Sequence, residues 1–259
     1  MDQGGRELEK KLEGQVAIVT GAGRNIGEAT VKLLAASGAS VALVDVNSDL
    51  ASGVARAIRE EGGAAEVFTA NIALEADVTK LVADVTAHFG KVDILVNNVA
   101  ISDNKHILDV TKEEWDRVIA VTLTGTFLMS KYVATQMVAQ GHGGAIVNIG
   151  STSGFYGRPR AIAYTAAKAG VANLSRSLAV QLAKHKIRVN CVVPNKIGSP
   201  VGKDTFDPTR PVVNLRDRPG VPEDLARAIL FLVSPDSDFI DGTTLFVDGG
   251  VSALMPGSE

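Results

Sequence analysis

The sequence predicts an α/β fold in which a doubly wound parallel sheet carries helices on both faces. Short apolar runs alternate with longer helical patterns along the 259 residues, and glycines mark many of the returns between them. A glycine-rich turn at 21–27 directly joins the first apolar run to the first helical pattern. This order of elements indicates parallel βαβ units with right-handed crossovers.

Seven apolar runs have the length expected of strands that are buried on both faces. They are residues 16–20, 41–45, 66–70, 93–97, 145–149, 187–193 and 244–247. Helices are expected between them at residues 28–37, 48–61, 75–89, 112–140, 164–184 and 222–233. The helix at 112–140 contains Gly125, where we expect an interruption, and the last begins at Pro222, a residue that the first turn of a helix tolerates.

Length and composition indicate one domain. A chain of 259 residues, of which 46% are hydrophobic, can bury a single substantial core. We therefore expect one domain over residues 14–259. Residues 1–13 are polar and charged, so we expect a flexible tail there, and neither a signal peptide nor a membrane anchor.

The charge balance argues against polyanionic partners. The formal net charge is −3, which gives no basic surplus for nucleic acid or for an anionic membrane. Cys191 is the single cysteine and cannot form an internal disulfide, which fits a reducing, cytoplasmic compartment. The four histidines are far apart in sequence, so no metal site is predicted.

The turn between the first strand and the first helix has the chemistry of a dinucleotide site. A strand, a glycine loop and a helix in succession present free backbone N–H groups and the positive end of a helix dipole to a phosphate. The candidate cofactor-binding residues of this turn are Gly21, Gly23, Arg24, Asn25, Ile26 and Gly27.

Asp45 ends the second strand, 18 residues after Gly27. A carboxylate at this place accepts hydrogen bonds from the adenosine ribose hydroxyls and repels a 2′-phosphate. It therefore favours NAD over NADP as cofactor. Arg24 argues the other way, because a cation there can meet a 2′-phosphate.

The chemistry is predicted at residues 151–168. Ser151 follows the fifth strand, and Tyr164 and Lys168 are spaced to lie one helical turn apart on one face. A phenol titrates near pH 10, so it needs a neighbouring positive charge to act as a base at neutral pH. Lys168 can supply that charge, while the Ser151 hydroxyl holds the substrate oxygen. This trio suits the reversible oxidation of an alcohol, although a lone tyrosine and lysine at this spacing are more often a solvated pair.

A long segment without periodicity, residues 194–219, begins beside this site. It is rich in proline, glycine, aspartate and arginine. Such a long connection inside one domain is usually a lid or a binding loop, so we assign it to the substrate.

From residue 14 to 250 the chain resembles the short-chain dehydrogenase/reductase family. The resemblance rests on the glycine motif at 20–27, the N-N-x-A motif at 97–100, Ser151 placed 13 residues before the Y-x-x-x-K motif, R-V-N at 188–190 and V-D-G-G at 247–250. It implies a seven-stranded Rossmann-like fold, usually in a homotetramer. It also implies that Ser151 orients the substrate oxygen, that Tyr164 is the acid/base, and that Lys168 lowers the tyrosine pKa and binds the nicotinamide ribose.

The resemblance also implies further cofactor contacts. Pro194, Ile197 and Ser199 are expected at the nicotinamide end, and Asn71, Ile72 and Asn98 at the adenosine end. Ala100 stands where the family usually has glycine, and is expected to narrow the cofactor cleft slightly.

Asn25 and Thr122 depart from the family pattern. Asn25 replaces a loop glycine, and asparagine tolerates a left-handed backbone better than most residues. Thr122 stands where the family has a catalytic asparagine that supports a water chain to the lysine. We hypothesise that Thr122, through its hydroxyl or its backbone, retains that relay with lower efficiency.

The leading hypothesis is an NAD-linked oxidoreductase that interconverts a small secondary alcohol and a ketone. One alternative is an NADPH-dependent 3-oxoacyl thioester reductase, for which Arg158 and Arg160 would meet an acidic carrier. Another is a weakly catalytic nucleotide-binding protein. The joint presence of Ser151, Tyr164 and Lys168 argues against the last, because a binding protein needs no such trio.

Overall fold

A computed structural model describes residues 10–201, 205, 207–209 and 211–254. It contains a seven-stranded, all-parallel sheet in the order β3-β2-β1-β4-β5-β6-β7, which confirms the predicted fold class. The strands are β1 (Val16–Thr20), β2 (Ser40–Asp45), β3 (Ala65–Thr69), β4 (Ile94–Asn97), β5 (Gly144–Ile149), β6 (Ile187–Pro194) and β7 (Thr244–Val247).

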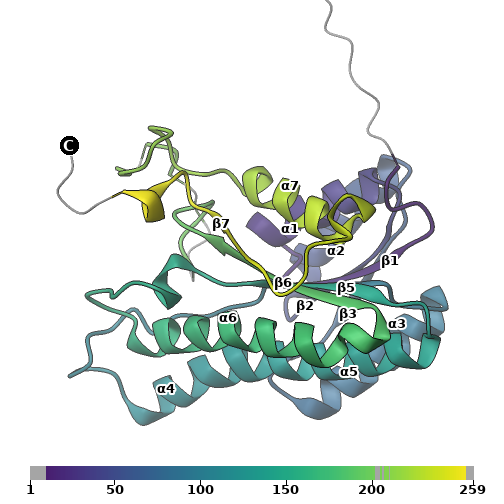
Figure 1. Cartoon of the computed structure of the whole chain (residues 1–259), viewed down its shortest axis with the longest axis horizontal. Coiled ribbons are helices and arrows are strands. Elements are labelled where there is room, and N and C mark those ends of the chain that lie inside the picture. The colour runs from purple at the N-terminus through teal and green to yellow at the C-terminus, as the bar shows by residue number, and fades with distance from the viewer. Residues whose placement is uncertain (1–9, 202–204, 206, 210, 255–259) are drawn as a thin grey trace, which may run out of the picture.

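Seven α-helices cover the two faces of this sheet (Figure 1). They are α1 (Asn25–Ala36), α2 (Ser48–Glu60), α3 (Glu75–Phe89), α4 (Lys112–Ile119), α5 (Gly125–Gln140), α6 (Ile162–Leu182) and α7 (Pro222–Val233). Helices α1, α2 and α7 lie on one face, and α3 to α6 lie on the other. Every predicted helix and strand is present, with ends shifted by a few residues at most.

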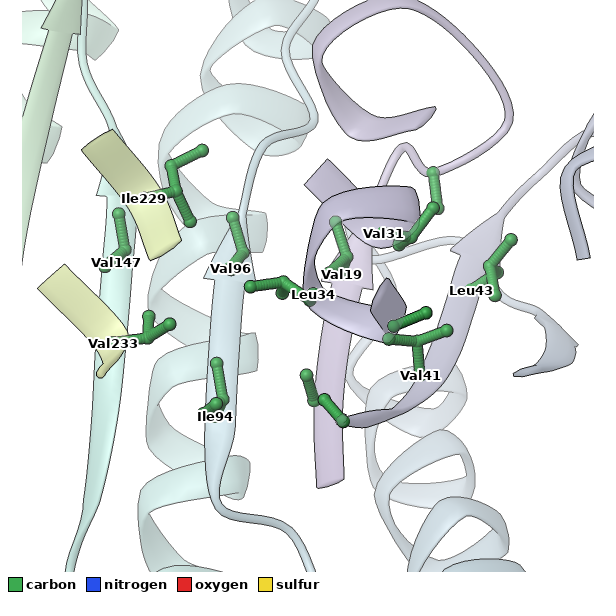
Figure 2. Close-up of a cluster of buried hydrophobic side chains, with 14 of the residues drawn as sticks. Val19, Val31, Leu34, Val41, Leu43, Ile94, Val96, Val147, Ile229 and Val233 are labelled. Atoms are coloured by element: carbon green, nitrogen blue, oxygen red, sulfur yellow. The ribbon is translucent and has the colours of Figure 1, made fainter. Parts of the chain in front are cut away.

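The strands are apolar throughout because both of their faces are buried. In β1, Ala17 and Val19 point to the face covered by α1 and α7, while Val16 and Ile18 point to the face covered by α3 and α5. This alternation divides the core into two layers. Figure 2 shows part of the first layer, where side chains of α1 and α7 pack over the central strands.

The strand order reverses between β1 and β4. The chain runs outward from β1 to β3, then returns to the other side of β1 and continues from β4 to β7. In doubly wound sheets, the crevice outside the carboxyl ends of the strands at this switch point is where ligands bind. The loops after β1 and β4 meet there.

The interruption expected near Gly125 is a single π-helical turn, Ala120–Thr124, between α4 and α5. The combined helix from 112 to 140 is long and apolar enough to cross a membrane by length and composition alone. Half of its most apolar window is buried inside the protein, however, as in the core helix of a soluble protein.

The predicted tail ends earlier than residue 13. Residues 11–14 form a turn, and the Leu12 side chain is fully buried in the core beneath α1. The Leu12 N–H also donates to the Ser37 carbonyl (2.9 Å). One apolar side chain among charged neighbours was too weak a signal to predict this contact. Residues 1–9 lie outside the described part of the chain.

Candidate active site

A cleft of about 1150 Å³ opens at the carboxyl ends of the strands. Fifteen of the predicted site residues line it: Gly21, Arg24, Asn25, Ile26, Asp45, Asn71, Ile72, Asn98, Ala100, Ser151, Tyr164, Lys168, Pro194, Ile197 and Ser199. Gly23, Gly27 and Thr122 do not line it. The switch point therefore brings together residues that are up to 178 positions apart in sequence (Gly21 to Ser199). The three exceptions are buried behind the residues that line the cleft.

The glycine turn holds α1 close to β1. A Cβ on Gly27 would lie 1.9 Å from the Gly21 carbonyl oxygen, so no other residue fits there without moving the backbone. Gly21 itself has a φ of +66°, which glycine adopts without strain. Gly27 thus serves the packing of the helix against the turn, which leaves the N-terminus of α1 facing the cleft.

Asn25 has a φ of +54°, which confirms the expectation that it takes a left-handed backbone. Its side chain also makes a hydrogen bond, in which Nδ2 donates to the Ser199 carbonyl (3.3 Å). A Cβ on Gly198 would lie 1.9 Å from Asn25 Oδ1. Asn25 therefore ties the glycine turn to the segment that follows β6.

Asp45 is fixed at the end of β2 by two backbone hydrogen bonds. Its Oδ2 accepts from the Gly23 N–H and its Oδ1 from the Asn47 N–H, both at 3.0 Å. A Cβ on Gly23 would lie 3.0 Å from Oδ2. Gly23 thus allows the carboxylate to approach the turn, and each carboxylate oxygen keeps a lone pair for a ligand.

The two asparagines at the carboxyl end of β4, Asn97 and Asn98, have different roles. Asn98 lines the cleft, and its Nδ2 donates to the Thr20 and Gly21 carbonyls (3.0 and 3.2 Å). Asn97 is buried instead, where its Nδ2 donates to Ser130 Oγ (3.0 Å) and Asn148 Oδ1 (2.8 Å). Only Asn98 is placed to face a ligand.

Asn71 and Ile72 close the far end of the cleft. Asn71 Oδ1 accepts from the Ala73 N–H (3.1 Å), which leaves one lone pair on the oxygen and the whole amide NH₂ for a ligand. Ile72 is buried and packs on the start of α5, where a Cβ on Gly125 would lie 2.9 Å from its side chain.

The structure brings Ser151, Tyr164 and Lys168 together at the opposite end of the cleft. All three are almost fully buried, with exposures of 7%, 5% and 2%. The Ser151 hydroxyl is near enough to the Tyr164 phenol to lower its pKa. Lys168 Nζ lies 5.8 Å from the centre of the Tyr164 ring and donates to the Ile149 carbonyl (2.5 Å).

Burial has the largest effect on the pKa values of Tyr164 and Lys168. It raises the pKa of the Tyr164 phenol, against the opposing effects of the Ser151 hydroxyl and the Arg158 charge. Burial also lowers the pKa of Lys168 to about 8. The expected lowering of the phenol pKa is thus not the net effect in this structure, because desolvation disfavours both charged forms.

Thr122 lies in the π turn with its side chain fully buried. Its hydroxyl donates to the Ile101 carbonyl and accepts from the Ile101 N–H, both at 3.2 Å, and its carbonyl accepts from Thr126 Oγ1 (2.9 Å). The hydroxyl thus holds the wall of the cleft at Ile101, and among the described residues it makes no hydrogen bond to Lys168. The relay through Thr122 stays a prediction.

Two residues near Tyr164 were not assigned these positions from the sequence. Asp103 accepts from the Ala163 and Tyr164 N–H groups (3.5 and 3.3 Å) and so caps α6, whose own N-cap residue, Ala161, has no polar side chain. Arg158 lies with its Cζ 6.0 Å from the centre of the Tyr164 ring. No local sequence pattern indicates these two positions. Asp103, for example, is 60 positions before Ala163, one of the two residues whose N–H groups it caps.

The segment predicted to bind substrate begins beside the trio. Residues 194–197 and 199–201 line the cleft, and Asn195 Nδ2 donates to Thr152 Oγ1 (2.7 Å). A parallel bridge between Ile197 and Gly220 ties the two ends of the segment together. Part of it, residues 202–204, 206 and 210, lies outside the described residues.

The residues present fit a dinucleotide. The cleft offers a helix N-terminus above a turn that admits only glycine at residue 27, a fixed carboxylate at the end of β2, and the buried trio at its other end. By contrast, the described residues contain no group of three histidine, cysteine, aspartate or glutamate side chains that could hold a metal ion.

Comparison with known proteins identifies the family. A family model described as enoyl-(acyl carrier protein) reductase matches residues 21–252. The chain is 42% identical over 246 residues to cis-4-hydroxycyclohexanecarboxylate dehydrogenase of Sinomonas cyclohexanicum, covering 93% of this chain and 97% of the relative. It is 36% identical to 2-(S)-hydroxypropyl-CoM dehydrogenase 3 of Xanthobacter autotrophicus, over 95% of this chain and all of the relative.

Solved structures agree with this result. The structure of levodione reductase superposes with a TM-score of 0.88 at 32% identity, covering 94% of this chain and 100% of that one. The structure of NAD⁺-bound xylitol dehydrogenase gives a TM-score of 0.85 at 32% identity, over 93% and 100% of the two chains. Sequence, fold and site together establish that this chain belongs to the short-chain dehydrogenase/reductase family.

Proposed function

We propose that the protein is an NAD(H)-dependent oxidoreductase that interconverts a secondary alcohol and a ketone. The observation that carries the proposal is the meeting of Ser151, Tyr164 and Lys168 in the wall of a cleft whose other end holds Asp45. The first three suit proton transfer to or from an alcohol oxygen, and the carboxylate suits an adenosine ribose without a 2′-phosphate.

Each residue has a defined role in this proposal. The bound nicotinamide supplies the site that gives or takes a hydride. The Ser151 hydroxyl and the Tyr164 phenol, which line the same part of the cleft, hold the substrate oxygen, and Tyr164 exchanges the proton with it. Lys168, anchored on the Ile149 carbonyl, supplies a positive charge beside the ring and a donor for the nicotinamide ribose.

The cofactor preference is tested by steady-state kinetics with NAD⁺ and NADP⁺. We expect a higher kcat/KM with NAD⁺, and a shift toward NADP⁺ in Asp45→Ser, which removes the charge that repels a 2′-phosphate. Equal kcat/KM values with both cofactors in the native protein would contradict the NAD preference. They would leave the proposed interconversion of alcohol and ketone unaffected.

The test of the reaction is a panel of secondary alcohols and the matching ketones. The Sinomonas relative is named for a cyclic hydroxycarboxylate, so cyclic alcohols and cyclic hydroxy acids belong in the panel. Turnover of 3-oxoacyl thioesters with NADPH in place of these alcohols would favour the thioester reductase. NADH binding without turnover of any member would favour a nucleotide-binding protein.

We also propose a homotetramer, as the family resemblance implies, and a cytoplasmic location, with which the single cysteine agrees. Sedimentation velocity on the purified protein tests the assembly. A monomer at micromolar concentration would contradict it.

A further inference from the structure

The cleft is cationic although the chain as a whole is acidic. The formal net charge of the protein is −3. Among the described residues, the charged ones that line the cleft are nevertheless Arg24, Arg117, Arg158, Arg160, Lys168, Lys196 and one carboxylate, Asp45. Such an excess of one sign in a concave site raises the local concentration of ligands of the opposite sign.

The cations are not all at the cofactor end. Arg24 belongs to the glycine turn, where it can meet a nucleotide. Arg158 and Arg160 are instead in the loop between Ser151 and α6, and the Arg158 guanidinium lies over the Tyr164 ring. A charge beside the catalytic phenol is close to the substrate and far from the turn that receives the pyrophosphate.

Arg158 is exposed toward the cleft and keeps most of its donors free. Its Nη1 donates to Ser153 Oγ at 3.4 Å, which is a long hydrogen bond. No carboxylate of the described residues pairs with Arg158, whereas arginines such as Arg218 and Arg227 pair with Asp224. A guanidinium has five N–H donors in a planar fork, which suits a carboxylate better than a hydroxyl.

The position of Arg158 is set by the loop ends. Ser151 begins the short 3₁₀ turn that carries Ser153, and Ala161 ends the loop with a φ of +71°. Ala161 is fully buried, and its N–H donates to the Lys105 carbonyl (2.8 Å). Both ends are therefore anchored, so the loop holds the Arg158 side chain near Tyr164.

We propose that Arg158 recognises a carboxylate on the substrate, so that the protein acts on hydroxy or oxo acids. This inference rests on the proposed function and names its substrate class. The guanidinium binds the carboxylate while Ser151 and Tyr164 hold the oxygen that reacts. Its charge also favours the phenolate of Tyr164, in line with its effect on the phenol.

The test uses an acid and an amide of the same shape, of which only the acid carries a charge. With NADH bound, calorimetry measures the affinities of cyclohexanecarboxylate and cyclohexanecarboxamide. We expect the acid to bind more tightly to the native protein. In Arg158→Gln we expect the acid to lose about tenfold in affinity and the amide to change little, because only the acid uses the charge.

Two further variants separate this role from a general effect of charge or folding. Arg56→Gln removes an exposed arginine of α2 that does not line the cleft, and it should leave both affinities unchanged. Arg158→Lys keeps the charge without the planar fork, and it should restore part of the preference for the acid.

The inference is overturned if the acid binds no more tightly than the amide, or if Arg56→Gln and Arg158→Gln weaken the acid equally. It is also overturned if the acid does not bind at all to the NADH complex. The proposed function fails separately, because it is measured by turnover of the whole panel of neutral and acidic secondary alcohols and not by binding of the acid. If the protein turns over neutral alcohols but does not bind the acid, only this inference is overturned and the proposed function stands.

Discussion

The two ends of the cleft are built in different ways. At the cofactor end, the backbone N–H groups of the glycine turn, in which a Cβ on Gly27 would lie 1.9 Å from a carbonyl, face the ligand beside the Asp45, Asn71 and Asn98 side chains. At the substrate end the ligand-facing groups are the side chains of Ser151, Tyr164 and Arg158, carried by a loop and the first turn of α6. Backbone geometry therefore helps to fix what the first end binds, while side chains determine what the second end does.

The largest effect is expected from Tyr164→Phe, which tests whether all of the proton chemistry lies at the substrate end. General acid–base catalysis contributes about 10²–10⁴-fold, so turnover should fall by that factor. The dissociation constant for NADH, measured by fluorescence titration, should stay within a few-fold of the native value. Retained turnover would refute the role of Tyr164. Loss of NADH binding would show that the two ends are not separable.

Lys168 belongs to both ends, and its burial makes a prediction about stability. Its pKa of about 8 in the folded protein compares with an ordinary value of 10.5. Between these two pH values the unfolded chain binds more protons, so the free energy of unfolding should rise with pH across that window. The full rise corresponds to about 3 kcal/mol.

Urea unfolding of the native protein and of Lys168→Met, at pH values from 7 to 10.5, measures this contribution. The difference in free energy of unfolding between the two proteins should move in favour of the native protein as the pH rises. Lys80→Met, which removes an exposed lysine of α3, serves as the control and should follow the native curve. Parallel curves for the native protein and Lys168→Met would mean that burial does not perturb the lysine.

The two ends of the cleft also differ in how much of each could be predicted from the sequence. Strand periods, glycine positions and Asp45 are local signals, so the fold and the position of the glycine turn beside Asp45 could be predicted from the residues. Asn71, Ile72 and Asn98, by contrast, were expected in the cleft only from the family resemblance. Asp103 and the location of Arg158 could not be predicted, because they depend on how a loop meets a helix that is distant in sequence. Thr122 was assigned by its position in a motif, and the hydrogen bonds of its hydroxyl with Ile101 could not be predicted from that motif.

Gly27→Ala tests the cofactor end by itself. Because its Cβ would overlap the Gly21 carbonyl, the turn must open or α1 must move, and overpacking of this kind costs about 1–3 kcal/mol. We expect NADH affinity to fall by about 5–150-fold with the trio unchanged. The control is Gly53→Ala in α2, where a Cβ would meet nothing within 4 Å and NADH binding should not change. Equal behaviour of the two variants would contradict the packing role of Gly27.

The smallest effect is expected from Asp103→Ala, which tests whether a distant loop positions the substrate end. Asp103 supplies the cap that Ala161 cannot, and the loss of a helix cap costs about 0.5–2 kcal/mol of stability. Tyr164 N–H is one of the capped groups, so kcat should fall while NADH affinity is retained. Asp109→Ala, an exposed aspartate of the same segment, provides the control. The contrary result is that Asp103→Ala lowers stability but leaves kcat and its pH profile unchanged. In that case the cap stabilises α6 without positioning the phenol, and the loop that carries Asp103 has no part in the chemistry of the substrate end.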